Sequence, residues 1–281
     1  MANDVAVRVE GLRKRYGDTS AVDGVELEIG RGEVFALLGP NGAGKTTTVE
    51  ILEGFRQRDG GVAEVLGEDP GRAGRAWRAR IGIVLQLAAA GPELTVREMI
   101  RHFAGFYPRP RDPDEVIALV GLDEQAGKRI SALSGGQARR VDVALGIVGR
   151  PELLFLDEPT TGFDPGARRQ FWELVRALAA EGVTILLTTH YLEEAEALAG
   201  RLAVLAGGRV VATGTPAALG GTNRPSRVSW DSADGHRTVQ TPTPAKVVAD
   251  LARQAGGEVP GLTVTRPTLE DTYLELIGEP A

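Results

Sequence analysis

Residues 39–47 read Gly39-Pro40-Asn41-Gly42-Ala43-Gly44-Lys45-Thr46-Thr47. This run fits the G-x-x-x-x-G-K-[ST] phosphate-binding pattern, and it stands between an apolar strand-like run at residues 34–38 and a helical pattern at residues 44–55. Glycines let backbone N–H groups turn toward phosphates, and the start of a helix favours an anion. We expect Lys45 to reach the β- and γ-phosphates of a nucleotide and Thr46 to bind Mg²⁺.

Two other interpretations of this run are weaker. A glycine-rich turn between a strand and a helix can exist without any ligand. A dinucleotide-binding loop of the G-x-G-x-x-G type is disfavoured, because Thr47 stands where that pattern needs a glycine.

Two acids, Asp157 and Glu158, follow the apolar run at residues 153–156. In a parallel sheet they would lie at the carboxyl edge, which is also the edge that carries the phosphate loop. We expect Asp157 to hold Mg²⁺, directly or through water, and Glu158 to orient and deprotonate the attacking water. Acids after a strand are more often solvated turn residues when no other motif is present, so this interpretation depends on the phosphate loop.

The composition limits the class of protein. A length of 281 residues predicts roughly two domains. A net charge of −6 argues against a sequence-independent nucleic-acid binder, and the lack of cysteine excludes disulfides and thiolate chemistry. No apolar run is long enough to suggest a signal peptide or a membrane span, so we expect any spans to come from another chain.

Apolar strand-like runs alternate with helical patterns through the first two thirds of the chain, which predicts an α/β fold around a parallel sheet. The turn-rich run GGTNRP at residues 220–225 is the predicted domain boundary. We therefore expect a domain at residues 1–220 and a small α+β domain at residues 221–281, with helices at 244–254 and 268–277.

Two further motifs narrow the choice among families of nucleotide-binding proteins. The run Leu133-Ser134-Gly135-Gly136-Gln137 opens a helical pattern, and His190 follows Thr188-Thr189 after an apolar strand. With both phosphate motifs, and in this order, the chain resembles the nucleotide-binding subunit of an ATP-binding cassette (ABC) transporter over nearly all of residues 4–220. Taken alone, the first run would more often be a helix cap, and a single histidine after a strand a structural hydrogen-bonding residue.

The resemblance implies a fold and an assembly. The fold is a P-loop NTPase cassette with a RecA-like core, an antiparallel β subdomain, a helical signature subdomain at about residues 87–150 and the small C-terminal α+β appendage. In that family two chains sandwich two ATP molecules head to tail. The helix that begins at Ser134 then faces the γ-phosphate of the ATP bound to the partner chain.

The resemblance also implies residue roles. His190 would contact the γ-phosphate, and Gln86 would sense Mg²⁺ and the attacking water and connect them to a membrane partner. Tyr16 would stack on adenine, although it can also be an ordinary surface tyrosine. Asp164 would lie in a loop that crosses the dimer interface, where Phe163 replaces the usual leucine. The implied catalytic residues are Lys45, Gln86, Glu158 and His190, and the implied metal ligands are Thr46, Gln86 and Asp157.

Residues 266–276 (RPTLEDTYLEL) resemble the closing motif of the daunorubicin/doxorubicin-resistance type of ABC ATPase, an exporter branch whose subunits pair with separate ABC-2-type membrane permeases. An ordinary amphipathic helix is the alternative. We expect this helix to contribute both to the core and to a dimerisation or regulatory surface.

The expected function is an ATP-binding and ATP-hydrolysing subunit that dimerises around ATP and drives export, of a drug or a lipid-like substrate, through the permease. We expect a cytoplasmic protein, peripheral on the inner face of the cell membrane. A homodimer is expected, and a heterodimer stays open. No nucleic-acid partner is expected, and the arginine-rich residues 72–80 are interpreted as a solvated helix face.

Two functions other than export stay open for a chain with these motifs. A soluble cassette ATPase could do mechanical work on DNA or ribosomes, but such relatives usually carry a coiled-coil or zinc-bearing insertion or two cassettes in one chain. A regulatory ATP sensor without transport is the other. The sequence gives no direct sign of the transported substrate.

Overall fold

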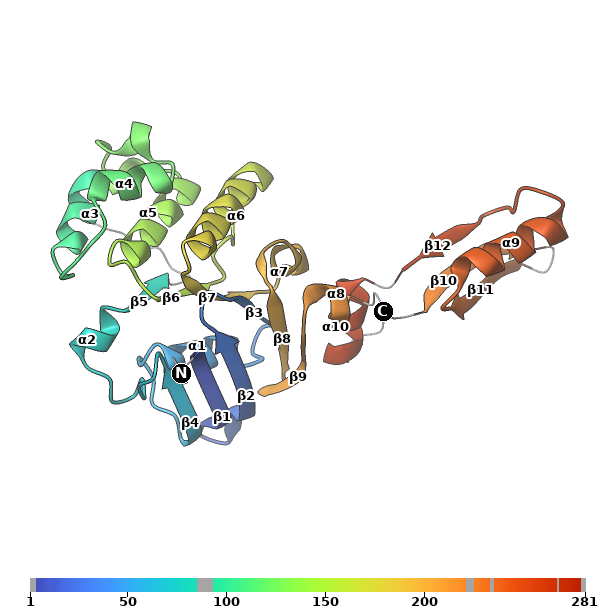
Figure 1. The fold of residues 1–281 in the computed structure, drawn as a ribbon, viewed down its shortest axis with the longest axis horizontal. Helices are drawn as coiled ribbons and strands as arrows, with labels where there is room; N and C mark the ends of the chain where they lie inside the picture. The colour runs from blue at the N-terminus through green and yellow to red at the C-terminus, as the bar shows by residue number, and fades with distance from the viewer. Residues whose placement is uncertain (1–3, 85–92, 221–224, 233–234, 267, 279–281) are drawn as a thin grey trace. The chain divides into compact units, whose positions relative to one another are not determined.

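A computed structural model describes residues 4–84, 93–220, 225–232, 235–266 and 268–278. The chain forms two compact units, Met1–Ala212 and Thr213–Ala281 (Figure 1). The phosphate-binding run and the other motifs between Tyr16 and His190 belong to unit 1.

The larger sheet of unit 1 has the strand order β5-β6-β7-β3-β8-β9. Its strands are β3 (Val34–Leu38), β5 (Ile81–Val84), β6 (Leu153–Asp157), β7 (Thr184–Thr189), β8 (Arg201–Ala206) and β9 (Arg209–Gly214). The pairs β5–β6, β6–β7, β7–β3 and β3–β8 are parallel, and every residue of β6 and β7 is buried. The predicted parallel sheet, buried on both faces, is confirmed.

A second sheet is antiparallel and has the order β2-β1-β4, with β1 (Val5–Tyr16), β2 (Thr19–Gly30) and β4 (Gly60–Val65). Both β1 and β2 run through exposed as well as buried residues. The pairing passes through register shifts on either side of Gly11, where φ is 57°. The larger sheet and this one share a core that includes Val7, Leu27, Phe35 and Trp77.

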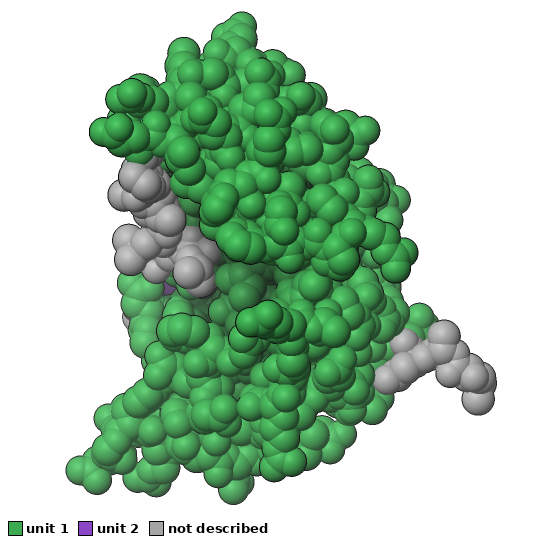
Figure 2. All heavy atoms as spheres, turned by 90° about the vertical axis from the view of Figure 1, so that its left-hand side faces the viewer, with its two compact units in different colours: residues 1–212 green, residues 213–281 purple. Residues whose placement is uncertain are grey.

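Helices connect these strands. They are α1 (Lys45–Leu52), α2 (Arg75–Arg78), α3 (Val96–Ala104), α4 (Pro113–Leu119), α5 (Gly135–Ile147), α6 (Pro165–Ala180) and α7 (Leu192–Leu198). Figure 1 shows α3, α4 and α5 grouped on one side of the strands, and α3 packs against both of the others. A view onto the side that carries α2 and α3 shows a recess between this helical part and the β-strands (Figure 2).

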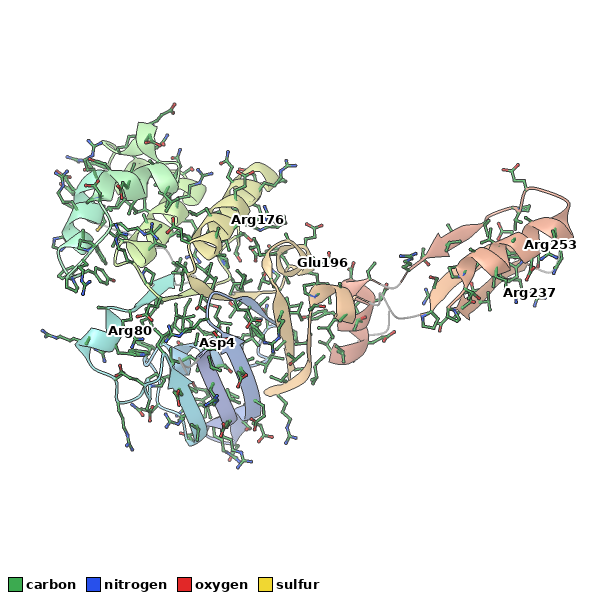
Figure 3. The ribbon with its side chains drawn as sticks, in the orientation of Figure 1. Asp4, Arg80, Arg176, Glu196, Arg237 and Arg253 are labelled. Carbon is green, nitrogen blue, oxygen red and sulfur yellow. The ribbon has the colours of Figure 1, made fainter. Side chains whose placement is uncertain are left out.

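An ion pair joins the residues that precede β5 and β6, at one edge of the larger sheet. Arg80, labelled in Figure 3, lies between α2 and β5, and its Nε is 2.6 Å from Oε1 of Glu152, the residue before β6. The same arginine's backbone carbonyl accepts a hydrogen bond from Glu152 N at 2.8 Å. The amino ends of β5 and β6 are therefore held side by side.

Unit 2 contains α8 (Pro216–Leu219), β10 (Ser226–Ser232), β11 (Gly235–Thr241), α9 (Pro244–Ala255), β12 (Thr263–Thr265) and α10 (Leu269–Ile277). Its sheet has the order β11-β10-β12, α9 packs on β10, and α8 packs on α10. The units divide after Ala212 rather than at the predicted residues 220–225, of which 221–224 lie outside the described residues. The difference arises because α8 contacts α10 and so groups with the C-terminal unit.

Candidate functional site

The phosphate loop joins β3 to α1. A Cβ on Gly39 would lie 2.4 Å from the carbonyl oxygen of Leu205, and a Cβ on Gly44 would lie 2.3 Å from that of Ala21. Gly42 has a φ of 79°, in the left-handed region, with no atom within 4 Å of its added Cβ. The two ends of the loop are therefore pressed against β8 and β2, while its middle is open to a ligand.

The Lys45 side chain turns back into this loop. Its Nζ donates hydrogen bonds to the carbonyl oxygens of Gly39 at 2.7 Å and Pro40 at 3.2 Å, and it lies 3.9 Å from Glu158 Oε1. Burial lowers the pKa of Lys45, while the carboxylates of Glu158 and Asp157 act in the opposite direction. A cation thus stands between the loop and the acids at the end of β6.

The Glu158 carboxylate also faces the histidine predicted from the next strand. Its Oε2 lies 3.4 Å from His190 Nδ1, and the side chains of Glu158 and His190 are 13% and 38% exposed. The Tyr191 ring packs 4.1 Å from the His190 ring, measured between ring centres. Lys45, Glu158 and His190, predicted from three separate motifs, therefore meet at one carboxylate.

A residue without a predicted role of its own connects the two acids. Thr188 Oγ1 donates to Asp157 Oδ1 at 2.5 Å and accepts from Glu158 N at 3.0 Å. The Glu158 N–H also points at the carbonyl oxygen of Thr188, 3.1 Å away. The sequence places Thr188 beside the histidine motif, but only the pairing of β6 with β7 sets it opposite Asp157.

A further acid is buried at the end of α1. Glu53 is 7% exposed, and burial raises its pKa to about 8, with the carboxylates of Asp157 and Glu50 acting in the same direction. Glu53 is thus predominantly protonated at neutral pH in the folded chain. No sequence motif singles it out.

Tyr16 is the last residue of β1 and is 42% exposed. The Arg56 guanidinium lies 5.3 Å from its ring centre. Tyr16 pairs with Thr19 across the β1–β2 turn, and nearby Ala21 contacts Gly44. The ring therefore lies at the end of the β-ribbon that meets the phosphate loop, where a stacked base could be received.

The signature residues begin α5. Ser134 is its N-cap: Ser134 Oγ accepts from Gln137 N at 3.3 Å, and Gln137 Oε1 accepts from Ser134 N at 3.1 Å. This is a capping box, as the predicted helix start required. Asp164 is the N-cap of α6, and its Oδ1 accepts from Gly166 N at 2.8 Å and Ala167 N at 2.9 Å.

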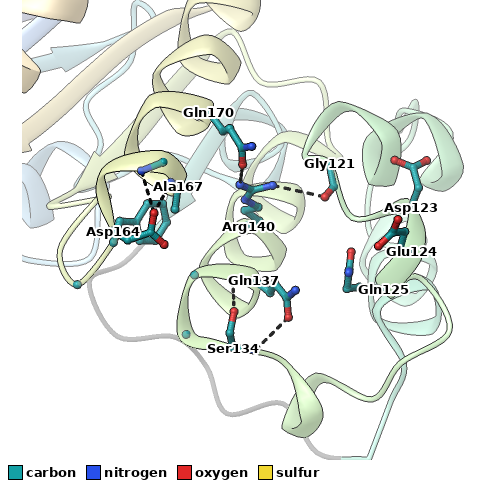
Figure 4. A pocket seen from close by; sticks show the side chains of 15 residues that line it. Gly121, Asp123, Glu124, Gln125, Ser134, Gln137, Arg140, Asp164, Ala167 and Gln170 are labelled. Carbon is teal, nitrogen blue, oxygen red and sulfur yellow. Dashed lines mark hydrogen bonds between the residues drawn. The ribbon is translucent and has the colours of Figure 1, made fainter.

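These two helix starts face a common open hollow of about 940 Å³ (Figure 4). Its lining includes Ser134, Gly135, Gly136, Gln137, Asp164 and Gln170. Arg140, also in the lining, hydrogen bonds to the Gln170 side chain and so bridges α5 and α6. Lys45, Glu158 and His190 are not among the lining residues. Within one chain, the predicted site residues thus form two groups rather than one.

Gln86 lies outside the described residues. Among the residues that the structure describes, no group of three or more His, Asp or Glu side chains could enclose a metal ion. Mg²⁺ commonly takes one or two protein ligands and completes its shell with phosphates and water. The exposed Thr46 hydroxyl at the start of α1 and the Asp157 carboxylate at the end of β6 are compatible with that kind of site.

Comparisons with known proteins agree with this geometry. The family described as "ABC transporter" matches residues 22–161. Daunorubicin resistance ATP-binding protein DrrA3 of Streptomyces coeruleorubidus is 37% identical, over 98% of this chain and 97% of that protein. Nod factor export ATP-binding protein I of Ralstonia nicotianae is 46% identical, over 74% of this chain and 66% of that protein.

Solved structures share the fold. A dimeric ATP-binding cassette in a post-hydrolysis state, bound to ADP and Pi, superposes with a TM-score of 0.68 at 24% identity, over 74% of this chain and 98% of that chain. The predicted P-loop cassette fold is therefore confirmed. In the described part of the chain, no helix is long and apolar enough to span a membrane. This chain belongs to the ABC transporter family, as an ATP-binding ATPase subunit of the daunorubicin-resistance type.

Proposed function

We propose that this subunit grips ATP in the phosphate loop, dimerises around it, and uses its hydrolysis to drive export through a separate membrane permease. The meeting of Lys45, Glu158 and His190 carries the proposal, because the distances of 3.9 and 3.4 Å join three motifs far apart in the sequence. A cation, a carboxylate and an imidazole at one point can orient water against a phosphate.

Binding would use the loop and the first turn of α1. Backbone N–H groups at a helix start favour phosphate, and Lys45 would move from its carbonyl partners to the β- and γ-phosphates. Thr46 and Asp157 would hold Mg²⁺, which neutralises phosphate charge when bound. Gln86 is proposed as a further Mg²⁺ contact, and Tyr16 as the platform for adenine.

Hydrolysis would use Glu158 as the base. Its carboxylate accepts a proton from water as the water oxygen attacks the γ-phosphorus, while the bond to the bridging oxygen of ADP breaks. His190, beside Oε2, would hold the γ-phosphate and the base in place. Thr188 would keep the backbone of Glu158 fixed while the carboxylate works.

The second group of residues supports a composite site. The hollow at Ser134 and Asp164 is open, and it does not contain the Lys45 group. A capped helix start with two following glycines can receive an anion, and a second copy can supply one as the γ-phosphate of its own ATP. We therefore infer a head-to-tail homodimer, in which each ATP lies between one chain's Lys45 and the other chain's Ser134.

Export and location are inferred from the relatives. Their names refer to drug resistance and Nod factor export, which favours a drug or a lipid-like cargo and does not favour work on DNA or ribosomes. An ABC-2-type permease would provide the membrane spans and place the subunit on the cytoplasmic face. The surface around Gln86 to Arg97 is the proposed contact with it. Residues 221–281 are proposed to act in dimerisation or regulation.

Glu158→Gln tests the proposal. We expect it to retain ATP affinity, to lower turnover at least a hundredfold, and to accumulate an ATP-bound dimer in light scattering. Lys45→Ala is the matched comparison, and it should weaken ATP binding itself. Wild-type turnover by Glu158→Gln would remove Glu158 from the role of base, and unchanged ATP affinity in Lys45→Ala would contradict the role of the loop.

A further inference from the structure

Arg139 lies on α5, five residues after Ser134, and its side chain points into the molecule. It is 6% exposed. Its Nη2 donates to the carbonyl oxygen of Asp157 at 2.9 Å, and its Nε donates to the carbonyl oxygen of Pro159 at 3.2 Å. The two carbonyls belong to the residues on either side of Glu158. The signature helix thus holds the backbone of the proposed base from both sides.

Glu158 needs such support. Its φ is 44°, in the left-handed region that a residue with a side chain adopts only when its surroundings hold it there. Thr188 binds the N–H of Glu158, and Arg139 binds the carbonyls before and after it. The direction of the Glu158 carboxylate therefore depends on contacts from β7 and from α5 together.

Burying an arginine here is costly. Burial lowers the pKa of Arg139, while the carboxylates of Asp142, one turn further along α5 and 3.7 Å from Nη1, and of Asp157 act in the opposite direction. Burial also raises the pKa of Asp142 to about 6. Apolar side chains of similar size commonly pack such a place at least as stably. The buried Arg139–Asp142 pair is therefore explained better by the Glu158 backbone that Arg139 holds than by a gain in stability.

We propose that Arg139 is a positioning residue that links the two nucleotide sites of the dimer. This inference rests on the proposed head-to-tail dimer. Ser134 and Arg139 are about 7.5 Å apart along one helix, at about 1.5 Å per residue, so a shift of α5 moves both. When Ser134 engages the nucleotide of the partner subunit, Arg139 sets Glu158 against the nucleotide held by its own Lys45.

The proposal predicts a split between binding and turnover. Arg139→Met keeps the length of the side chain but removes every donor. We expect kcat to fall at least tenfold and KM for ATP to stay within about twofold. The Hill coefficient for ATP should fall toward one, because ATP binding at one site of the dimer would no longer affect the other site. Arg139→Lys, which keeps one charged donor beside Asp142, should retain an intermediate kcat.

The Glu158→Gln background distinguishes a positioning role of Arg139 from a general loss of structure. Combined with Glu158→Gln, Arg139→Met should lower the residual turnover no further and should leave the ATP-bound dimer intact, since the group that it positions is gone. Arg176→Met is the control: Arg176, labelled on α6 in Figure 3, also donates to a carbonyl, that of Ala197 at 3.2 Å, but at an exposed position. Its kcat should match the wild type.

Two results would overturn the inference. One is an equal fall in turnover from Arg139→Met with and without Glu158→Gln. The other is a rise in KM that accounts for the whole loss. If Arg139→Met does not fold, a wild-type kcat and Hill coefficient in Arg139→Lys would overturn the inference equally. Failure of Glu158→Gln to trap a dimer would instead contradict the proposed function, so the two failures are distinguishable.

Discussion

At the scale of single residues, one hydroxyl orders both acids of the site. Thr188 is fully buried, and a hydroxyl can donate one hydrogen bond while accepting others. Its donor bond goes to the Asp157 carboxylate, and its accepted bond comes from the Glu158 N–H. Loss of this hydroxyl would remove one hydrogen bond from the Asp157 side chain and one from the Glu158 N–H at the same time.

Thr188→Val keeps the shape of the side chain and removes both bonds. We expect kcat to fall roughly tenfold or more, because unsatisfied buried partners cost about 1–3 kcal/mol. ATP affinity, measured with a fluorescent analogue, should change little. Thr184→Val, at the other end of β7, is the control: it loses only a bond from Gly32 N at 3.0 Å. Equal losses of kcat in the two variants would contradict a specific role of the Thr188 hydroxyl in ordering Asp157 and Glu158.

Residues whose place in the candidate site follows from a local motif were predictable. The phosphate loop carries its own spacing, and Glu158 and His190 follow buried strands whose carboxyl ends share one edge. Thr188 and Arg139 were not predictable, because their partners come from other elements: the register of β6 with β7 in one case and the packing of α5 in the other. Glu53 was missed because a single acid in a helical run carries no signal of burial.

At the scale of elements, α5 and α3 begin with the same device. Thr95 caps α3, accepting from Glu98 N at 3.3 Å while Glu98 Oε2 accepts from Thr95 N at 2.9 Å. Ser134 and Gln137 make the matching pair on α5. The two caps should contribute similar stability, but only the α5 cap faces the hollow with Asp164.

Removing each cap separates stability from assembly. We expect Ser134→Ala and Thr95→Ala each to lower the free energy of unfolding by about 1 kcal/mol, because each leaves an N–H of the first turn without its partner. Only Ser134→Ala should also weaken ATP-dependent dimerisation, measured by light scattering in the Glu158→Gln background. Equal dimerisation in both variants would contradict the anion role of the α5 start.

The elements themselves were predicted unevenly. Helix starts at Ser134 and Thr268 were predicted, and both residues are N-caps in the structure. The strands β1 and β2 run well beyond their apolar stretches, since backbone pairing across a ribbon continues through exposed charged residues. Such pairing leaves no apolar pattern in the sequence.

At the scale of the whole molecule, Glu53 makes stability depend on pH. Its pKa rises from about 4.5 in the unfolded chain to about 8 in the folded one. Between these values the folded state holds a proton that the unfolded state has lost, so the free energy of unfolding falls as pH rises. At about 1.4 kcal/mol per pKa unit, the upper limit of this loss is on the order of 5 kcal/mol.

Glu53→Gln should remove that penalty. We expect the variant to be more stable than the wild type, with a gain that grows from pH 5 to pH 8 and then levels off, in urea unfolding followed by circular dichroism. Glu28→Gln, an exposed change on β2, is the control and should stay within about 0.5 kcal/mol of the wild type. A gain for Glu53→Gln that does not vary with pH would mean that Glu53 is ionised in both states.

The separation of the site residues into two groups has a consequence for the whole assembly. One chain offers Lys45 with Glu158 and, in a separate hollow, Ser134 with Asp164. If each ATP needs one group from each copy, a chain lacking Lys45 still has an intact Ser134 to give. Two inactive chains with different defects could then build one intact site between them.

Mixing Lys45→Ala and Ser134→Ala subunits tests this composite site most directly. Each variant alone should show little ATP hydrolysis. An equal mixture should recover up to about a quarter of wild-type turnover, since half of the dimers are mixed and each mixed dimer has one intact site. Turnover in the mixture that equals the mean of the two separate variants at every ratio would contradict a site shared between copies.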